Sequence, residues 1–187
     1  MISTLIILLS DSDSSTVEVA WEALSRVIGS VPKKVLPLYI KLVRDAVSTS
    51  RDKERRKKKG GPVVIPGFCL PKALQPLLPI FLQGLTSGSA ELREQAALGL
   101  GELIEVTSEK ALKDFVIPIT GPLIRIIGDR FPWQVKSAIL STLSILIRKG
   151  GMSLRPFLPQ LQTTFIKCLQ DSTRHQMLVF GRQFSQL

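Results

Sequence analysis

The sequence predicts an all-α protein built as a solenoid, a stack of antiparallel helical hairpins. Apolar residues make up 44% of its 187 residues but aromatic residues only 6%, so the apolar content rests on Leu, Ile, Val and Ala. That composition is typical of packed helices rather than of sheets. Two further observations support the prediction. Apolar side chains recur at steps of three and four, and the pattern repeats about every 40 residues.

The repeat is visible in a Leu-Pro or Ile-Pro pair that opens an apolar stretch at helical spacing four times. The four prolines are Pro37, Pro79, Pro118 and Pro159, which are 42, 39 and 41 positions apart. HEAT and armadillo repeats have periods of about 40–47 residues. Because the first N–H groups of a helix have no partner within it, a proline there costs little. We therefore expect each proline to mark the start of a helix, or a kink one turn in, within a right-handed α-solenoid of HEAT/armadillo-like hairpins.

The clearest hairpin consists of residues 72–86 and 89–106. Each segment carries apolar residues on one helical face, and a Thr-Ser-Gly-Ser cluster separates the two. Ser89 followed by Glu91 is typical of an N-cap with an acid in the first turn. This pair of segments is the template for the rest of the chain.

The other elements are placed by comparison with this hairpin. Among second helices, Leu92 aligns with Val135, 43 positions later, and Thr16 aligns as an earlier copy. Gly121-Pro122 should kink or split its helix, and residues 51–71 should be irregular where a second helix is due. We expect residues 2–9 to be the C-terminal end of a first helix and residues 15–29 to be the helix that pairs with it. In order, the predicted helices are 2–9, 15–29, 33–50, 72–86, 89–106, 109–128, 132–149 and 153–170.

The predicted domain organisation is a single solenoid segment. We expect residues 1–174 to form about four repeats, with a basic insert at 51–61, and residues 175–187 to form a divergent tail. The chain starts apolar and stops in mid-repeat. Because hairpins in a solenoid are covered by their neighbours, we expect this chain to be a segment of a longer solenoid, and to be marginally stable or to associate through its ends when isolated.

Four stretches are more specific than a generic repeat. They are RDKERRKKKGGPVVIPGFCLPKALQPLLPIFLQGL, SAELREQAALGLGELIEVTS, ITGPLIRIIGDRFPWQVK and FLPQLQTTFIKCLQDS. They resemble the large HEAT-repeat translational activator of the general amino-acid control kinase, which phosphorylates the alpha subunit of initiation factor 2. The resemblance runs from about Asp11 to Arg174 and covers a small, late part of such a protein. Beyond Arg174 the family continues with another helix, whereas this chain reads HQMLVFGRQFSQL.

The resemblance implies a non-enzymatic scaffold of the cytoplasm that needs no cofactor. In the family, the protein associates with translating or stalled ribosomes and binds the N-terminal RWD domain of the kinase, which uncharged tRNA then activates in amino-acid starvation. The partners implied for this chain are therefore the ribosome and that RWD domain.

A basic run provides the candidate ribosome-binding residues. The net charge of +10 suggests an anionic partner, and cations of the run could displace counterions from ribosomal RNA phosphates. The alternatives are a solvated loop between repeats and a nuclear-import signal. No aromatic residue interrupts the run, so base stacking has no support. The residues are Arg51, Lys53, Arg55, Arg56, Lys57, Lys58 and Lys59.

The turn between the helices 109–128 and 132–149 provides the candidate partner-binding residues. Arg125 and Arg130 could form bidentate bonds with carboxylates of a partner, mainly because this stretch resembles the kinase-binding region of the family. Trp133 could anchor an interface. The alternatives are an exposed Arg125, an Arg130 paired with Asp129 or capping a helix, and a Trp133 that covers the turn.

Other functions have little support in the sequence. Cys69 and Cys168 have no metal-like spacing, so we expect two buried or half-buried thiols and no metal site. No apolar run approaches the ~20 residues of a membrane span. The glutamates of 89–106 and the single His175 lack catalytic partners. Gly99 and Gly101 lie within a helix, where small residues allow close packing, and form no phosphate loop.

Three hypotheses remain. The first is the ribosome-associated kinase activator. The second is a generic HEAT-repeat adaptor that binds acidic proteins or nucleic acid, for example in nuclear transport. The third is an enzyme, which the lack of a catalytic constellation disfavours.

Overall fold

The computed structural model describes residues 1–57, 60–128 and 131–171 and is all-α over these ranges, which confirms the predicted fold class. No strand occurs in the described ranges. The helices are α1 (Ile2–Leu8), α2 (Ser14–Ser30), α3 (Ile40–Lys57), α4 (Leu78–Ser87), α5 (Ala90–Glu105), α6 (Glu109–Leu112), α7 (Val116–Ile127), α8 (Trp133–Gly150) and α9 (Leu158–Asp171). Short 3-10 helices are η1 (Leu36–Tyr39), η2 (Pro66–Cys69), η3 (Lys113–Phe115) and η4 (Gly151–Phe157).

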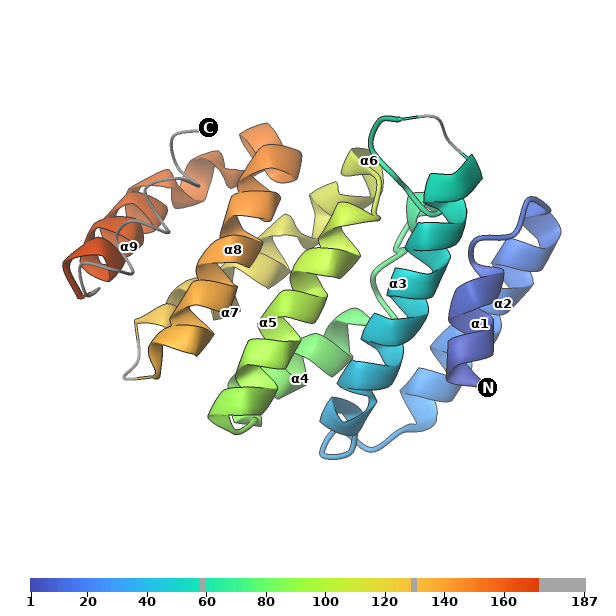
Figure 1. Ribbon diagram of the computed structural model, residues 1–187, viewed down its shortest axis with the longest axis horizontal. Coiled ribbons are helices and arrows are strands. Elements are labelled where there is room, and N and C mark those ends of the chain that lie inside the picture. The colour runs from blue at the N-terminus through green and yellow to red at the C-terminus, as the bar shows by residue number, and fades with distance from the viewer. Residues whose placement is uncertain (58–59, 129–130, 172–187) are drawn as a thin grey trace.

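The helices form two layers of a solenoid (Figure 1). In the first layer, α3 packs between α1 and α5, and α5 packs against α8. All four run in the same direction (Figure 1). In the second layer, which runs the opposite way, α7 packs against α4 and α9, and α2 lies behind α1. The core between the layers is one continuous cluster of aliphatic side chains, as expected when each hairpin is covered by its neighbours.

The helices α2 and α5 begin at side-chain caps that the sequence supplies. The carboxylate of Asp13 accepts a hydrogen bond of 2.9 Å from the N–H of Thr16, and the hydroxyl of Ser89 accepts one of 3.3 Å from Leu92. Each satisfies a backbone donor that has no partner inside the helix. Pro79 lies in the first turn of α4, so the N-cap at Ser89 and the proline rule are both confirmed for the template hairpin.

The predicted pairing of helices is wrong in the first third of the chain. The repeat pattern aligns Pro37 with Pro79 and Thr16 with Leu92, which would place α3 with α4 and α2 with α5. The structure instead places α3 beside α5 in the first layer and α2 in the second (Figure 1). A proline can start a helix of the first layer or of the second, and an apolar stripe can pack in either layer. Sequence alone therefore does not determine the layer.

Residues 51–71 are also more ordered than predicted. α3 continues to Lys57, so the first part of the expected basic insert is helical. Residues 63–69, here called the strap, then cross between repeats. The N–H of Gly67 donates to Leu9 O at 2.8 Å, and that of Ile65 donates to Val106 O at 3.0 Å. Ile65 and Phe68 are fully buried, so the apolar strap fills a place in the core.

The helix predicted at 109–128 is interrupted, but not at Gly121-Pro122. The break is the 3-10 turn at Lys113–Phe115. The helix α7 continues without interruption through Pro122. Pro122 removes one backbone donor, whereas Ile119 and Leu123 on either side are completely buried. Burial of that apolar face offsets the lost hydrogen bond.

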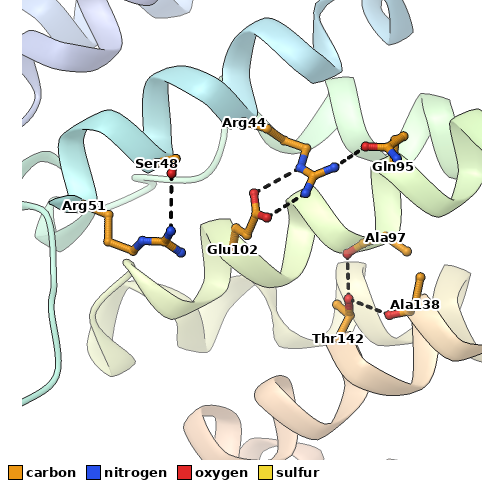
Figure 2. A network of polar contacts seen from close by, with 8 residues as sticks. All are labelled: Arg44, Ser48, Arg51, Gln95, Ala97, Glu102, Ala138 and Thr142. Carbon is orange, nitrogen blue, oxygen red and sulfur yellow. Dashed lines mark hydrogen bonds and ion pairs between the residues drawn. The ribbon is translucent and has the colours of Figure 1, made fainter.

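Polar side chains connect successive helices of the first layer (Figure 2). Arg44 of α3 donates to both carboxylate oxygens of Glu102 on α5, at 3.1 and 2.7 Å, and also to Gln95. On the other side of α5, the hydroxyl of Thr142 on α8 donates to Ala97 O at 2.6 Å. A Cβ on Gly99 would collide with Phe81 and with the stem of Arg44, in agreement with the predicted role of this glycine in close packing.

Candidate partner-binding surfaces

The part of the predicted basic run from Arg51 to Lys57 forms the last turns of α3. Ser50 and Glu54, one turn apart, are buried, and the hydroxyl of Ser50 donates to Ile6 O of α1 at 3.4 Å. This orientation leaves Lys53, Arg55 and Arg56 exposed to solvent. Cations in the last turn also complement the negative end of the helix dipole.

Lys57 and Arg51 instead make polar contacts within the fold. The ammonium of Lys57 lies 2.6 Å from the carboxylate of the buried Glu54 and 3.5 Å from Ser10 O. It compensates a charge that would otherwise be costly to bury, so Lys57 is engaged within the fold. Arg51 is half-buried, and its guanidinium donates to the hydroxyl of Ser48 at 3.3 Å. Lys58 and Lys59 lie outside the described residues.

The structure adds two basic residues that the sequence did not single out. Arg148 and Lys149 lie in the last turn of α8, which belongs to the same layer as α3 and runs in the same direction. Lys149 Nζ donates to the carbonyls of Ile104, Glu105 and Thr107 at 3.0, 2.5 and 2.6 Å. Burial lowers the pKa of Lys149, against the opposing effect of the Glu105 carboxylate. The basic last turn of the predicted helix 132–149 is a usable signal in the sequence, but its neighbours are known only from the structure.

The candidate kinase-binding residues lie at the α7–α8 turn, where Arg125 is exposed in the last turn of α7. Trp133 is the first residue of α8, and 55% of its surface is exposed, so it does not pack over the turn. Arg130 lies outside the described residues. Because α3 and α8 run in parallel, this turn lies on the opposite edge of the solenoid from the basic end of α3 (Figure 1).

Arg93 of α5 holds the end of this turn, a role that sequence reasoning missed. Its guanidinium lies 4.5 Å from the centre of the Phe131 ring, within cation–π distance. The same group donates to Gly88 O at 2.8 Å and Thr86 O at 3.0 Å, and also to Leu85 O. Arg93 therefore caps α4 and contacts the residue that leads into α8.

Several of the remaining titratable groups in the ranges 1–57, 60–128 and 131–171 form ion pairs with one another. Glu102 is paired with Arg44, and Glu105 lies 3.9 Å from Arg148. No group of three or more potential metal ligands occurs among these residues. Cys168 is buried as expected, but Cys69 is exposed at the end of the strap, because Phe68 takes the buried position beside it.

No helix in the described part of the chain has the length and apolarity to span a membrane.

Comparison with known proteins gives consistent matches. The family model described as "Stalled ribosome sensor GCN1-like, HEAT repeats" matches residues 1–72, and a HEAT-repeat model matches residues 77–107. The chain is 85% identical over 174 residues to protein ILITYHIA of Arabidopsis thaliana and 43% identical over 175 residues to the stalled ribosome sensor GCN1 of Homo sapiens. It is 39% identical over 176 residues to the eIF-2-alpha kinase activator GCN1 of Saccharomyces cerevisiae.

These matches cover 93–94% of this chain but only 6% of each relative. No solved structure matches the chain significantly. The two layers of packed hairpins and the HEAT-repeat match define the class as a HEAT-repeat solenoid. Within that class, residues 1–72 match the GCN1-like HEAT-repeat model, and nearly the whole chain is similar to one short segment of the much longer GCN1 proteins.

Proposed function

We propose that this chain is a non-enzymatic scaffold segment of a ribosome-associated activator of the kinase that phosphorylates the initiation factor 2 alpha subunit, active under amino-acid starvation in the cytoplasm. The observation that carries the proposal is the identity of 39–44% over almost the whole chain with proteins named stalled ribosome sensors and kinase activators. A solenoid suits such a role, because it presents helix ends and turns along extended edges.

The first proposed contact is between the basic end of α3 and ribosomal RNA. Lys53, Arg55 and Arg56 are exposed side by side at one edge of the solenoid. Each cation that neutralises a phosphate releases a counterion, which favours binding at low salt. We include Lys58 and Lys59 in this surface from the sequence alone.

The second proposed contact is between the α7–α8 turn and the RWD domain of the kinase. Trp133 offers a large exposed aromatic surface, and Arg125 an exposed guanidinium. Tryptophan and arginine are among the residues most enriched at energetically dominant interface positions. We include Arg130 in this surface from the sequence alone. Because the two surfaces lie on opposite edges, ribosome and kinase could be bound at once.

A pull-down of the isolated RWD domain tests the kinase contact. Trp133→Ala and Arg125→Glu should each reduce capture at least about tenfold, the effect of a strong interface position. Arg26→Glu is the matched control, since Arg26 is an exposed arginine on α2. Capture unchanged by both variants would reject these contacts, and no capture by the intact chain would reject this segment as the RWD site.

The alternative is a generic HEAT-repeat adaptor that binds acidic proteins or nucleic acid in nuclear transport. The basic run supports it, since clustered Lys and Arg residues also form nuclear-localisation signals. Replacing Lys53, Arg55 and Arg56 by Ser separates the two. Loss of ribosome association supports the activator, whereas loss of nuclear accumulation alone supports the adaptor.

A further inference from the structure

A groove of about 300 Å³ lies at the edge where α3, α5 and α8 end. Arg51 and Arg55 line it from α3, and Arg148 from α8. The α3 and α8 residues are almost a hundred positions apart in the sequence and belong to different repeats. The lining also includes Glu105 and Lys149, while Pro62, Val63, Val106 and Ile145 provide apolar surface.

Arg51 has a donor without an acceptor. Its Nε is buried and makes no hydrogen bond, and the closest ion-pair contact of that atom is the Asp52 carboxylate at 3.8 Å. That distance is too long for a hydrogen bond. A buried donor of a charged group without a partner costs free energy, so a rotation of the Arg51 guanidinium that brings Nε to an acceptor in the groove would be favourable.

Arg148 is free to turn toward such an acceptor. Its side chain is 59% exposed, and its guanidinium is 3.9 Å from Glu105, a loose contact. Lys149, in contrast, is occupied with three carbonyls at the end of α5. Those bonds cover lone pairs that would otherwise repel an anion. Three guanidiniums therefore face the groove, with one carboxylate opposing them.

We propose that this groove binds a phosphate of an RNA backbone, with Arg51 and Arg148 donating to the same phosphate and Arg55 to its neighbour. The inference rests on the ribosome contact proposed above and assigns it to a composite site across repeats. Arginine forks match phosphate oxygens bidentately. The exposed Lys53 and Arg56 continue the positive charge beyond the groove, as a polyanion requires and a single carboxylate does not.

The test is binding of the whole chain to a short fluorescent RNA duplex, measured by anisotropy across a range of salt concentrations. Arg148→Gln should weaken binding about five- to tenfold and lower the salt slope by about one, as for one lost phosphate contact. Arg26→Gln, an exposed arginine on α2, removes the same charge elsewhere and should have a much smaller effect. Glu105→Gln should tighten binding about two- to fivefold, because it removes the opposing carboxylate.

Two further arms separate the possible failures. Arg51→Lys keeps the charge and loses the fork, and its effect should be less than additive with Arg148→Gln if both residues hold one phosphate. If Arg148→Gln behaves like Arg26→Gln while the Lys53/Arg55/Arg56 replacement abolishes binding, the groove is not the phosphate site, although the proposed RNA contact of α3 stands. If the intact chain does not bind RNA, both the groove site and the proposed RNA contact are rejected. Displacement of RNA by polyglutamate at equal charge would identify an acidic-protein site and overturn the proposal.

Discussion

Arg44 on α3 and Glu102 on α5 form a two-point ion pair that connects adjacent repeats, with nitrogen–oxygen distances of 3.1 and 2.7 Å. The hydrogen bond to Glu102 raises the pKa of Arg44 above its ordinary value. Both side chains are about a quarter exposed, so solvent screens the attraction only in part. The solenoid is thus held between repeats by specific polar contacts as well as by its aliphatic core.

The first prediction concerns this pair. A double-mutant cycle with Arg44→Met and Glu102→Gln, measured by urea unfolding, should give a coupling free energy of about 1 kcal/mol, at the upper end for partly exposed pairs with two-point geometry. The exposed pair of Arg26 and Glu22, 3.5 Å apart, is the control and should give about 0.3 kcal/mol. Equal coupling in the two cycles would show that Arg44 adds nothing specific.

The second prediction concerns Gly99. Alanine is favoured over glycine in a helix by about 1 kcal/mol, but here its Cβ would collide with Phe81 and Arg44. Gly99→Ala should therefore lower the free energy of unfolding by about 1–3 kcal/mol. At Gly29 on α2, an added Cβ would have no neighbouring atom within 4 Å, so Gly29→Ala should be neutral or stabilising. Thermal unfolding of both variants shows whether the helix propensity of alanine or the collision of its Cβ dominates at Gly99.

The third prediction concerns Lys149, which caps three carbonyls at the end of α5. Lys149→Met keeps most of the length of the side chain but leaves those acceptors without this donor. The free energy of unfolding should fall by about 1–3 kcal/mol. Arg148→Met, at the adjacent exposed position, should change it by less than about 0.5 kcal/mol. Equal losses at both positions would contradict the capping role.

The fourth prediction is the pH dependence of that contribution. Burial lowers the pKa of Lys149 in the folded chain below its ordinary value of 10.5. Between the lowered pKa and 10.5 the unfolded chain binds more protons than the folded chain. The stability of the wild type relative to Lys149→Met should therefore rise with pH in that window. Urea unfolding of both proteins from neutral pH toward 10.5 measures this difference, and a fall would contradict it.

The fifth prediction concerns the strap. If residues 63–69 were a solvated loop, their side chains would not affect stability. Because Phe68 is fully buried, Phe68→Ala should cost about 3–5 kcal/mol. Leu38, which is 77% exposed, provides the control, and Leu38→Ala should cost less than about 0.5 kcal/mol. A silent Phe68→Ala would show that the strap is not part of the core.

Individual helices could be predicted from the sequence better than their arrangement. The cap at Ser89 and the apolar faces of α4 and α5 depend on local spacing, and the structure confirms them, although α4 begins at Leu78 and residues 72–77 form turns instead of the predicted start of that helix. The placement of α3 depends on which helix covers it, and the proline at position 37 carries no such information. The strap escapes prediction for a related reason: its apolar residues follow no helical period, and their burial depends on Leu9 and Val106, far away in the sequence.

The same limit applies to the candidate surfaces. The charge run around Arg55 is visible as composition, but its relation to Arg148 exists only through the parallel packing of α3, α5 and α8. Lys57 shows the opposite case. In the sequence it is one more cation of the run, and the structure pairs it with the buried Glu54. Contacts between repeats thus decide which charges are available to a partner.

The most direct test of the central claim, that this segment contacts the ribosome through its basic edge, is co-sedimentation with purified ribosomes at about 0.15 M salt. The intact chain should sediment with the ribosomes, and a chain with Lys53, Arg55 and Arg56 replaced by Ser should remain in the supernatant. A matched replacement of Arg26, Lys33 and Lys34, exposed on and after α2, should sediment like the wild type. Equal sedimentation of both triple variants, or none by the intact chain, would contradict the claim.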